Sequence, residues 1–224
     1  MILLVSVIVL AVGLGYAFGG RLRRFEGLRL RWWTLALAGM AIQFLPLPEG
    51  AGGTDLVVRT AVLAISYTML LSFSIANLHL PGLPLVLIGL ACNFAVIAAN
   101  GGMPVSEQAL VHSGQADVLD ELRQSGSQKH HLMTEEDVLA FLADVIPVPK
   151  PVGQAISVGD VFVYAGLILL AMATMRGRIP SRDPTAWGPY RGKHRPGSPE
   201  RRPHRVTLDP RGPLPGATRW GTER

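Results

Sequence analysis

The chain has 224 residues, is 49% hydrophobic and carries a formal net charge of +5. Its apolar residues are gathered into long stretches with few charges, which is typical of membrane proteins and excludes an ordinary soluble domain. The single cysteine, Cys92, lies inside one of these stretches and excludes a disulfide framework within the chain.

Five apolar stretches predict five transmembrane helices. The first has 17 residues, which as a helix would measure roughly 26 Å, close to the thickness of a hydrocarbon core. No basic residue precedes it, so the pattern favours a retained span over a signal peptide. The predicted fold class is an all-α, multi-pass membrane helix bundle. The expected spans cover about residues 2–18, 32–45, 56–77, 83–99 and 158–175.

Charge divides the predicted membrane domain, residues 1–176, from a tail at 177–224. Residues 176–224 hold 12 Lys/Arg and 4 Asp/Glu, and arginines also follow the first span. Basic segments stay on the cytoplasmic side, so we expect the N-terminus outside and the C-terminus in the cytoplasm of a bacterial inner (plasma) membrane. The long loop 100–155 would then be external, with 3 basic and 8 acidic residues.

The tail is rich in proline and glycine and is expected to be disordered. Its basic residues predict contact with anionic lipid headgroups, because the tail is tethered at the bilayer surface. Nucleic acid is not an expected partner, because the aromatic residues of the tail are too sparse for base stacking.

Loop 100–155 is predicted to be partly helical. Asn100 and Gly101 suit the left-handed conformation that ends a helix. Short helices are expected over 106–112 and 116–122. A further amphipathic helix is expected from a capping-box-like start at Thr134 through Leu142.

Candidate polar residues flank the last span. Ser157 and Asp160 have capping-box spacing. Arg59 enters its own span from the same outer side, so an ion pair between Arg59 and Asp160 is a further hypothesis. Asn93, inside the fourth span, is expected to form an interhelical hydrogen bond rather than to bind a ligand.

Asp144 is expected at the end of the loop helix, where a carboxylate is disfavoured by the helix dipole. It would therefore have a basic or backbone partner in the loop, or be a solvated loop acid. His130 and His131 are weak metal candidates, since adjacent side chains on a helix point about 100° apart. No metal site or cofactor is predicted, and the sequence contains none of the HExxH, CxxC, GxSxG or phosphate-loop motifs.

The segment 144–160, DVIPVPKPVGQAISVGD, is interpreted as a structural clamp that joins the loop to the bundle. Its three prolines fix the chain along the outer membrane surface. Any functional site is expected beneath this clamp.

Three motifs resemble a known family: GRLRRFEGLRLRWW after the first span, NGGMPVS after the fourth, and LADVIPVPKP with ISVGDV before the last. Residues 1–176 are similar to the bacterial membrane proteins grouped as domain of unknown function 5317. The resemblance implies a small multi-pass protein of the bacterial inner membrane and brings no activity with it.

The leading functional hypothesis is a non-enzymatic envelope protein that binds a small ligand or a protein partner through loop 100–155. One alternative is a transport or ion-handling component that uses Asp160, Arg59 and Asn93. The other is an envelope enzyme with Asp144, Asp160 and His131 as acid–base groups.

Overall fold

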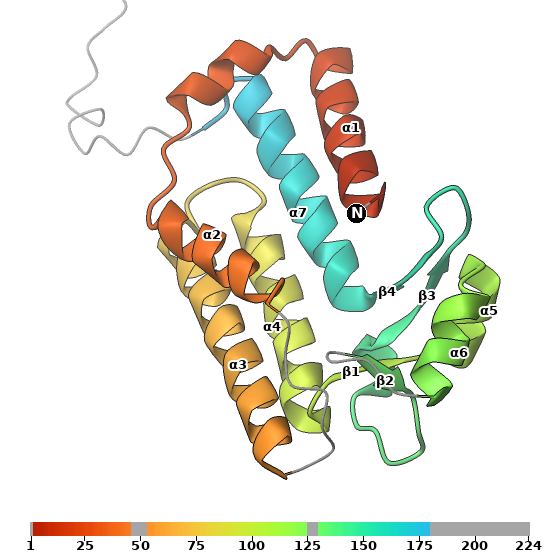
Figure 1. Cartoon of the computed structure of the whole chain (residues 1–224). Coiled ribbons are helices and arrows are strands. Elements are labelled where there is room, and N and C mark those ends of the chain that lie inside the picture. Colours follow the sequence, from red (N-terminus) through yellow and green to blue (C-terminus); the bar gives the residue numbers. More distant parts are fainter. Residues whose placement is uncertain (1, 46–52, 125–129, 180–224) are drawn as a thin grey trace, which may run out of the picture. The chain divides into compact units, whose positions relative to one another are not determined.

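The computed structural model describes residues 2–45, 53–124 and 130–179 (Figure 1). Contacts divide the chain into Met1–Ser181 and Arg182–Arg224. The second unit lies outside the described residues, as does the predicted disordered tail from residue 180 onward.

Five apolar helices pack in the spatial order α2–α3–α4–α7–α1. Their bounds are α1 Ile2–Ala17, α2 Trp33–Ile42, α3 Gly53–Ala76, α4 Leu83–Asn100 and α7 Val158–Met175. All five lie within the predicted spans to within a few residues. Many of their large apolar side chains, such as Val9, Leu37 and Ile65, are exposed, which suits contact with lipid.

Three of these helices are long and apolar enough to cross a membrane: Val57–Ala76, Leu83–Asn100 and Val158–Met175. α1 has 16 residues and α2 only 10. At 1.5 Å per residue α2 measures about 15 Å, or half of a hydrocarbon core. A membrane protein with three such helices is supported, whereas the predicted five complete spans are not confirmed.

Glycines bring α4 and α7 into close contact. A Cβ added at Gly159 would overlap the side chain of Asn93 and lie 2.6 Å from the carbonyl oxygen of Gly89. At the other end of the same contact, a Cβ on Gly166 would lie 2.6 Å from the carbonyl oxygen of Gly82. Small residues on both helices therefore allow the two backbones to touch.

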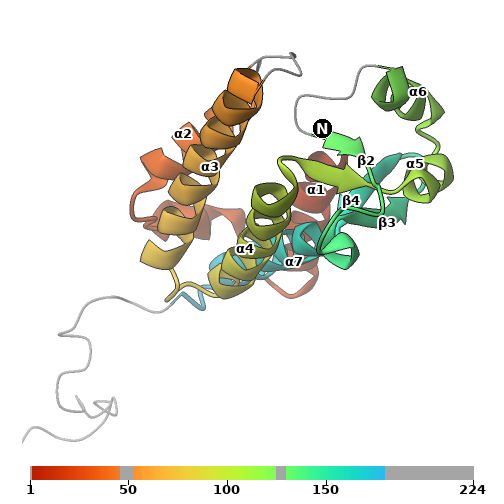
Figure 2. The same ribbon diagram turned by 90° about the horizontal axis from the view of Figure 1, so that it is seen from below.

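The prediction of an all-α fold is wrong in loop 100–155, which contains a four-stranded sheet of order β2–β1–β3–β4 (Figure 2). β1 pairs in parallel with β2 and β3, and β3 pairs antiparallel with β4. The strands are β1 Met103–Val105, β2 His130–Leu132, β3 Asp144–Val148 and β4 Gln154–Ser157. Strands of three to five residues are too short for a recognisable alternating pattern.

The two short loop helices are confirmed as α5 Glu107–Ser113 and α6 Ala116–Gln124. α4 ends at Asn100 with Gly101 in the left-handed region, also as predicted. The expected helix from Thr134 is wrong, since only the 3-10 turn η2, Ala140–Leu142, forms there. Asp137 does bond back to the Thr134 amide, but Leu139 has φ 58°, which ends any helical path.

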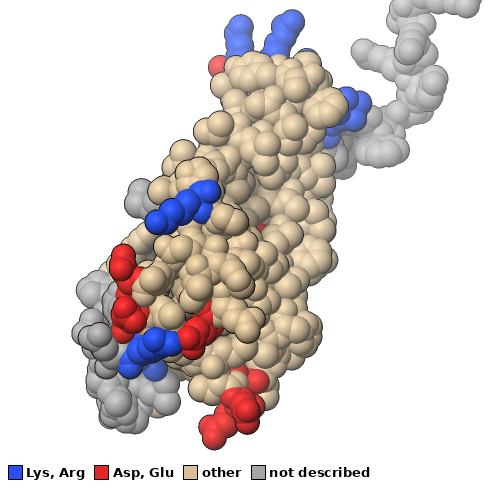
Figure 3. All heavy atoms as spheres, turned by 90° about the vertical axis from the view of Figure 1, so that its right-hand side faces the viewer, with Lys and Arg blue, Asp and Glu red and all other residues tan. Residues whose placement is uncertain are grey.

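Charged groups lie at opposite ends of the helices, separated by a band of uncharged surface (Figure 3). One end carries the arginine-containing 3-10 turn η1, Leu22–Gly27, which packs beside α7. The other end carries the sheet with α5 and α6 (Figure 1). This separation matches a membrane protein with polar groups at both surfaces.

Candidate functional site

Segment 144–160 is a β-hairpin that runs directly into α7. β3 and β4 pair with Asp144 opposite Ser157. The predicted capping box is confirmed: Ser157 Oγ accepts from the Asp160 amide at 2.9 Å, and Asp160 Oδ2 accepts from the Ser157 amide at 3.1 Å. The cap fixes the Asp160 carboxylate at the junction of sheet and helices.

Asn93 extends this cap across the glycine contact between α4 and α7. Its Nδ2 donates to Asp160 Oδ1 at 2.8 Å, and its Oδ1 accepts from Ser157 Oγ at 2.9 Å. The prediction of an interhelical hydrogen bond at Asn93 is thus confirmed. Asn93 and Ser157 are both buried, so these bonds satisfy polar groups that water does not reach.

The hypothetical pair of Arg59 and Asp160 is not observed among the ion pairs of the described residues. The side-chain hydrogen bonds of Asp160 go to Asn93 and Ser157 instead. Among the described residues, Arg59 Nε is buried and has no hydrogen-bond partner. Arg59 is also not among the residues that line the cavity beside Asp160.

Asp144 begins β3 and does not end a helix, so the dipole argument made for it does not apply. Only 7% of the residue is exposed, and the imidazole of His130 lies beside it, with Nε2 3.8 Å from Oδ2. Burial raises the pKa of Asp144 to about 8, and the nearby Asp160 carboxylate adds to the shift. At neutral pH the Asp144 carboxyl therefore holds its proton.

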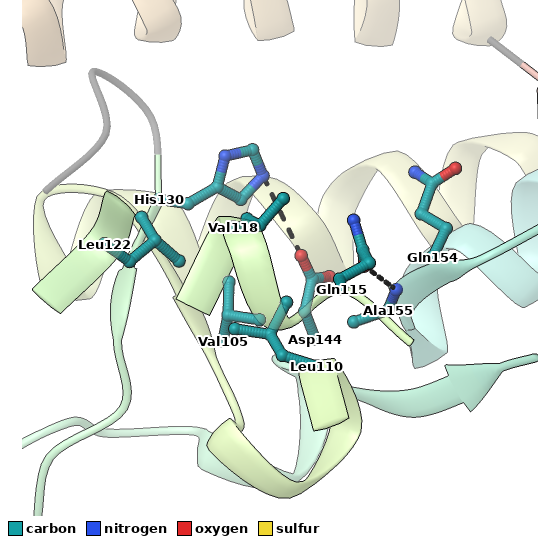
Figure 4. Close-up of a pocket in the computed structure, with 9 residues that line it drawn as sticks. All are labelled: Val105, Leu110, Gln115, Val118, Leu122, His130, Asp144, Gln154 and Ala155. Carbon is teal, nitrogen blue, oxygen red and sulfur yellow. Dashed lines mark hydrogen bonds and ion pairs between the residues drawn. The ribbon is translucent and has the colours of Figure 1, made fainter. Parts of the chain in front are cut away.

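Two cavities adjoin at Asp144, and we call them together the junction pocket. Both are lined by His130, Asp144, Gln154 and Ala155. The first, of about 180 Å³, lies between the sheet and α5 and α6 (Figure 4). The second, of about 140 Å³, lies against the helices. Its further lining residues are Gln43, Leu63, Tyr67, Asn93, Ile97, Met103 and Asp160.

The junction pocket brings together two carboxyl groups that are 16 positions apart in the sequence, Asp144 and Asp160. The residues that line its helix-side cavity include acids, amides, a histidine and a tyrosine, but no lysine or arginine among the described residues. Such a lining can accept hydrogen bonds and can neutralise a positive charge.

The two histidines face different carboxylates because they lie on a strand, where neighbouring side chains point to opposite faces. His130 faces Asp144, as Figure 4 shows. His131 Nε2 lies 2.8 Å from Asp137 Oδ1. Burial opposes ionisation of Asp137, but the His131 and Thr134 contacts outweigh it and lower the pKa of Asp137.

Asn100 has a structural position at the start of the loop. Its side chain donates to the Val138 carbonyl and accepts from the Val138 amide, both at 2.9 Å. Asn100 thus ties the end of α4 to the irregular segment before η2, and it does not line the junction pocket.

Sequence reasoning missed Tyr67, Gln43 and Gln154 as pocket residues. Tyr67 stacks on Phe94 at a centroid distance of 5.6 Å and sits in an apolar cluster, as an ordinary core tyrosine would. Gln43 and Gln154 have no spacing relation to the acids. Only the folded hairpin brings these groups to one place.

The chain was also compared with known proteins. A family model described as a family of unknown function (DUF5317) matches residues 27–172. A curated Thermotoga maritima protein, described as an uncharacterised protein, is 35% identical over 130 residues, covering 56% of this chain and 72% of that relative. No solved structure matches. The family match includes α2 to α6, most of α7 and all residues of the junction pocket, and the chain belongs to the DUF5317 family of unknown function.

Proposed function

We propose that the protein is a membrane-anchored binding protein whose segment 100–155 covers the junction pocket, and that this pocket takes a small cationic ligand. The observation that carries the proposal is the convergence of Asp144 and Asp160 on one cavity. Both acids come from the hairpin and helix start that join the loop to the helices.

The size of the pocket favours a ligand of a few heavy atoms. Pockets for drug-sized molecules measure roughly 300–1,000 Å³. The two cavities here measure about 180 and 140 Å³. A short primary amine fits these dimensions, and its ammonium group can donate to carboxyl, amide and phenol oxygens.

The burial and raised pKa of the Asp144 carboxyl favour a cationic ligand over an anionic or neutral one. A buried carboxyl with a pKa of about 8 lacks a close partner for its charged form, since its ion-pair neighbour among the described residues, His130 Nε2, lies 3.8 Å away. An ammonium group beside Asp144 and Asp160 would supply that partner and displace the proton. Binding is therefore expected to release a proton from Asp144 and to strengthen as the pH rises toward 8.

The test is a thermal-shift titration of the full chain in detergent with methylammonium and ethanolammonium. Ethylene glycol and acetate serve as neutral and anionic controls. Only the amines are expected to raise the melting temperature, and Asp144→Asn is expected to abolish the shift. Asp120→Asn is the matched control, because it removes an acid of the same loop that is 69% exposed. Equal stabilisation by glycol, or an unchanged amine response in Asp144→Asn, would contradict the proposal.

An acid–base enzyme is a second candidate for the same pocket, favoured by the buried Asp144 with its raised pKa beside His130. The histidine beside Asp144 is His130, whereas the enzyme hypothesis drawn from the sequence named His131. Mass spectrometry of a bound amine after incubation separates the two candidates. Recovery of unchanged ligand supports binding, whereas conversion that depends on Asp144 supports catalysis.

The transport alternative has less support. The buried polar side chains farther along the helices are engaged in structural hydrogen bonds. Ser66 donates to the Gly39 carbonyl at 2.7 Å, Thr174 to the Leu170 carbonyl at 2.7 Å, and Asn77 to the Arg31 carbonyl at 2.8 Å. The Ser66 and Asn77 bonds join different parts of the chain, and the Thr174 bond lies within α7, so the junction pocket is left as the favoured ligand site.

A further inference from the structure

Another cavity, of different character, lies at the opposite end of α7. It is an open groove of about 550 Å³ between η1 and the last turn of α7. We call it the arginine groove. Its lining residues are Arg21, Arg23, Arg24, Glu26, Gly27, Thr174, Gly177 and Ile179.

The groove carries an excess of positive charge. Three guanidinium groups line it against one carboxylate, that of Glu26, which lies 3.9 Å from Arg23 in an exposed pair. Exposed pairs of this kind are weak. Arg24 Nη1 donates to the Met175 carbonyl at 2.9 Å, which fixes this guanidinium at the wall of the groove.

Amphipathic side chains mark this end of the helices as an interface between lipid and water. Trp32 and Trp33 are 54% and 55% exposed. Phe18 is also exposed, and the guanidinium of Arg176 lies 5.7 Å from its ring centroid. Exposed tryptophan beside arginine is typical of the headgroup level of a bilayer.

We propose that the arginine groove binds the phosphate of an anionic phospholipid headgroup. Arginine recognises phosphate oxygens through two parallel N–H donors, and the groove presents three such groups at headgroup level. Residues 180–224 hold 10 Lys/Arg and 4 Asp/Glu, an excess of the same sign as that of the groove, so charge complementarity favours an anionic ligand from outside the chain. The inference concerns a different end of α7 and does not rest on the proposed function.

The experiment is native mass spectrometry of the detergent-purified full chain titrated with phosphatidylglycerol or with phosphatidylcholine of the same acyl chains. We expect phosphatidylglycerol to bind more tightly. The double variant R21Q/R23Q removes two exposed guanidinium groups of the groove and is expected to weaken its binding roughly tenfold or more. The variant R21K/R23K retains the charge and is expected to lose less.

The matched control is R29Q/R31Q, which removes the same charge from exposed arginines of the same segment outside the groove. It should change the affinity less than about twofold. Equal losses in the two glutamine variants would show diffuse attraction and overturn the groove assignment. So would an absence of preference for phosphatidylglycerol, or displacement of the lipid by millimolar inorganic phosphate. If R21Q/R23Q is not recovered folded, R23Q is compared with R29Q, with a difference of about fivefold expected.

Discussion

The two ends of α7 handle charge in opposite ways. At the junction pocket Asp144 is 7% exposed, and Asp160 is held by Asn93 and Ser157. At the arginine groove the residues Arg21 and Arg23 are exposed. The junction pocket shields its acidic side chains from water fully or in part, whereas the arginine groove exposes Arg21 and Arg23 to water.

This difference indicates which end demands a chemical explanation. An exposed arginine costs little and needs no partner. A buried carboxyl reduces stability unless its proton or a partner compensates the lost hydration. The junction pocket is therefore expected to reduce the stability of the fold, and sites that do so are candidates for function.

The largest expected effect comes from Gly159→Ala, which would break the frame of the junction pocket. The added Cβ would overlap Asn93 and press on the Gly89 carbonyl, and backbone atoms cannot move aside easily. Because the overlap is with backbone as well as with Asn93, we expect a loss of about 3 kcal/mol or more of unfolding free energy, measured by denaturant titration in mixed detergent.

Two alanine variants of α1 serve as controls. At Gly15 the added Cβ would meet the Met175 side chain rather than backbone atoms, and a side chain can shift more easily, so the expected loss is smaller. At Gly13 nothing lies within 4 Å, so alanine should be neutral or stabilise by up to ~1 kcal/mol. If Gly13→Ala and Gly159→Ala behaved alike, the close contact between α4 and α7 would be contradicted.

The next prediction concerns how the unfolding free energy changes with pH because of the Asp144 carboxyl. The pKa of its carboxyl rises from 3.8 to about 8 on folding, so the folded state prefers the protonated form. This contribution is complete below about pH 4 and is lost as the pH rises to about 8, with a slope of up to ~1.4 kcal/mol per pH unit. Asp144→Asn should flatten the profile and make the variant more stable than the parent above pH 8.

The measurement is the unfolding free energy between pH 5 and 9 in one detergent, with Asp120→Asn as the exposed control. Asp160, His130 and Tyr67 also line the pocket and are the same in the parent and in Asp144→Asn, so the difference between the two profiles isolates Asp144. An unchanged slope in Asp144→Asn would mean that the carboxyl is not buried in its neutral form.

A smaller effect is expected at the bridge from Asn93 to the α7 cap. Asn93→Ala leaves Asp160 and Ser157 each without one partner, at a cost of about 1–3 kcal/mol. Ser157→Ala removes the cap and costs about 0.5–2 kcal/mol. The two losses should be non-additive by at least ~0.5 kcal/mol, because the side chains are bonded to each other. Strict additivity in this cycle would contradict the bond.

The features predicted correctly from sequence are those with local signals. The helices α3, α4 and α7 follow from continuous apolar stretches, and the Ser157–Asp160 cap from its three-residue spacing. Asn93 was assigned correctly because a buried amide in a helix bundle has few other uses.

The sheet and the pocket could not be predicted because their contacts are non-local. β1 pairs with a strand 27 positions later, from Met103 to His130, and each strand has only three residues. The helix predicted for 134–142 would place Asp144 at a helix end, whereas Asp144 is the first residue of β3. Treating His130 and His131 as helical neighbours obscured the strand geometry that turns His130 alone toward Asp144.

The smallest effect is expected at the other end of α7, where Arg24→Gln removes the hydrogen bond to the Met175 carbonyl. A charge-assisted bond at the exposed end of a helix contributes about 0.5–1 kcal/mol. Arg23→Gln, whose side chain is 88% exposed, should change the unfolding free energy by less than ~0.5 kcal/mol. The Arg24 effect should shrink in high salt, whereas the Asp144 effect should persist because buried charges are screened less. If the changes in unfolding free energy at Arg24 and at Asp144 depended equally on salt, the contrast between an exposed and a buried end of α7 would be contradicted.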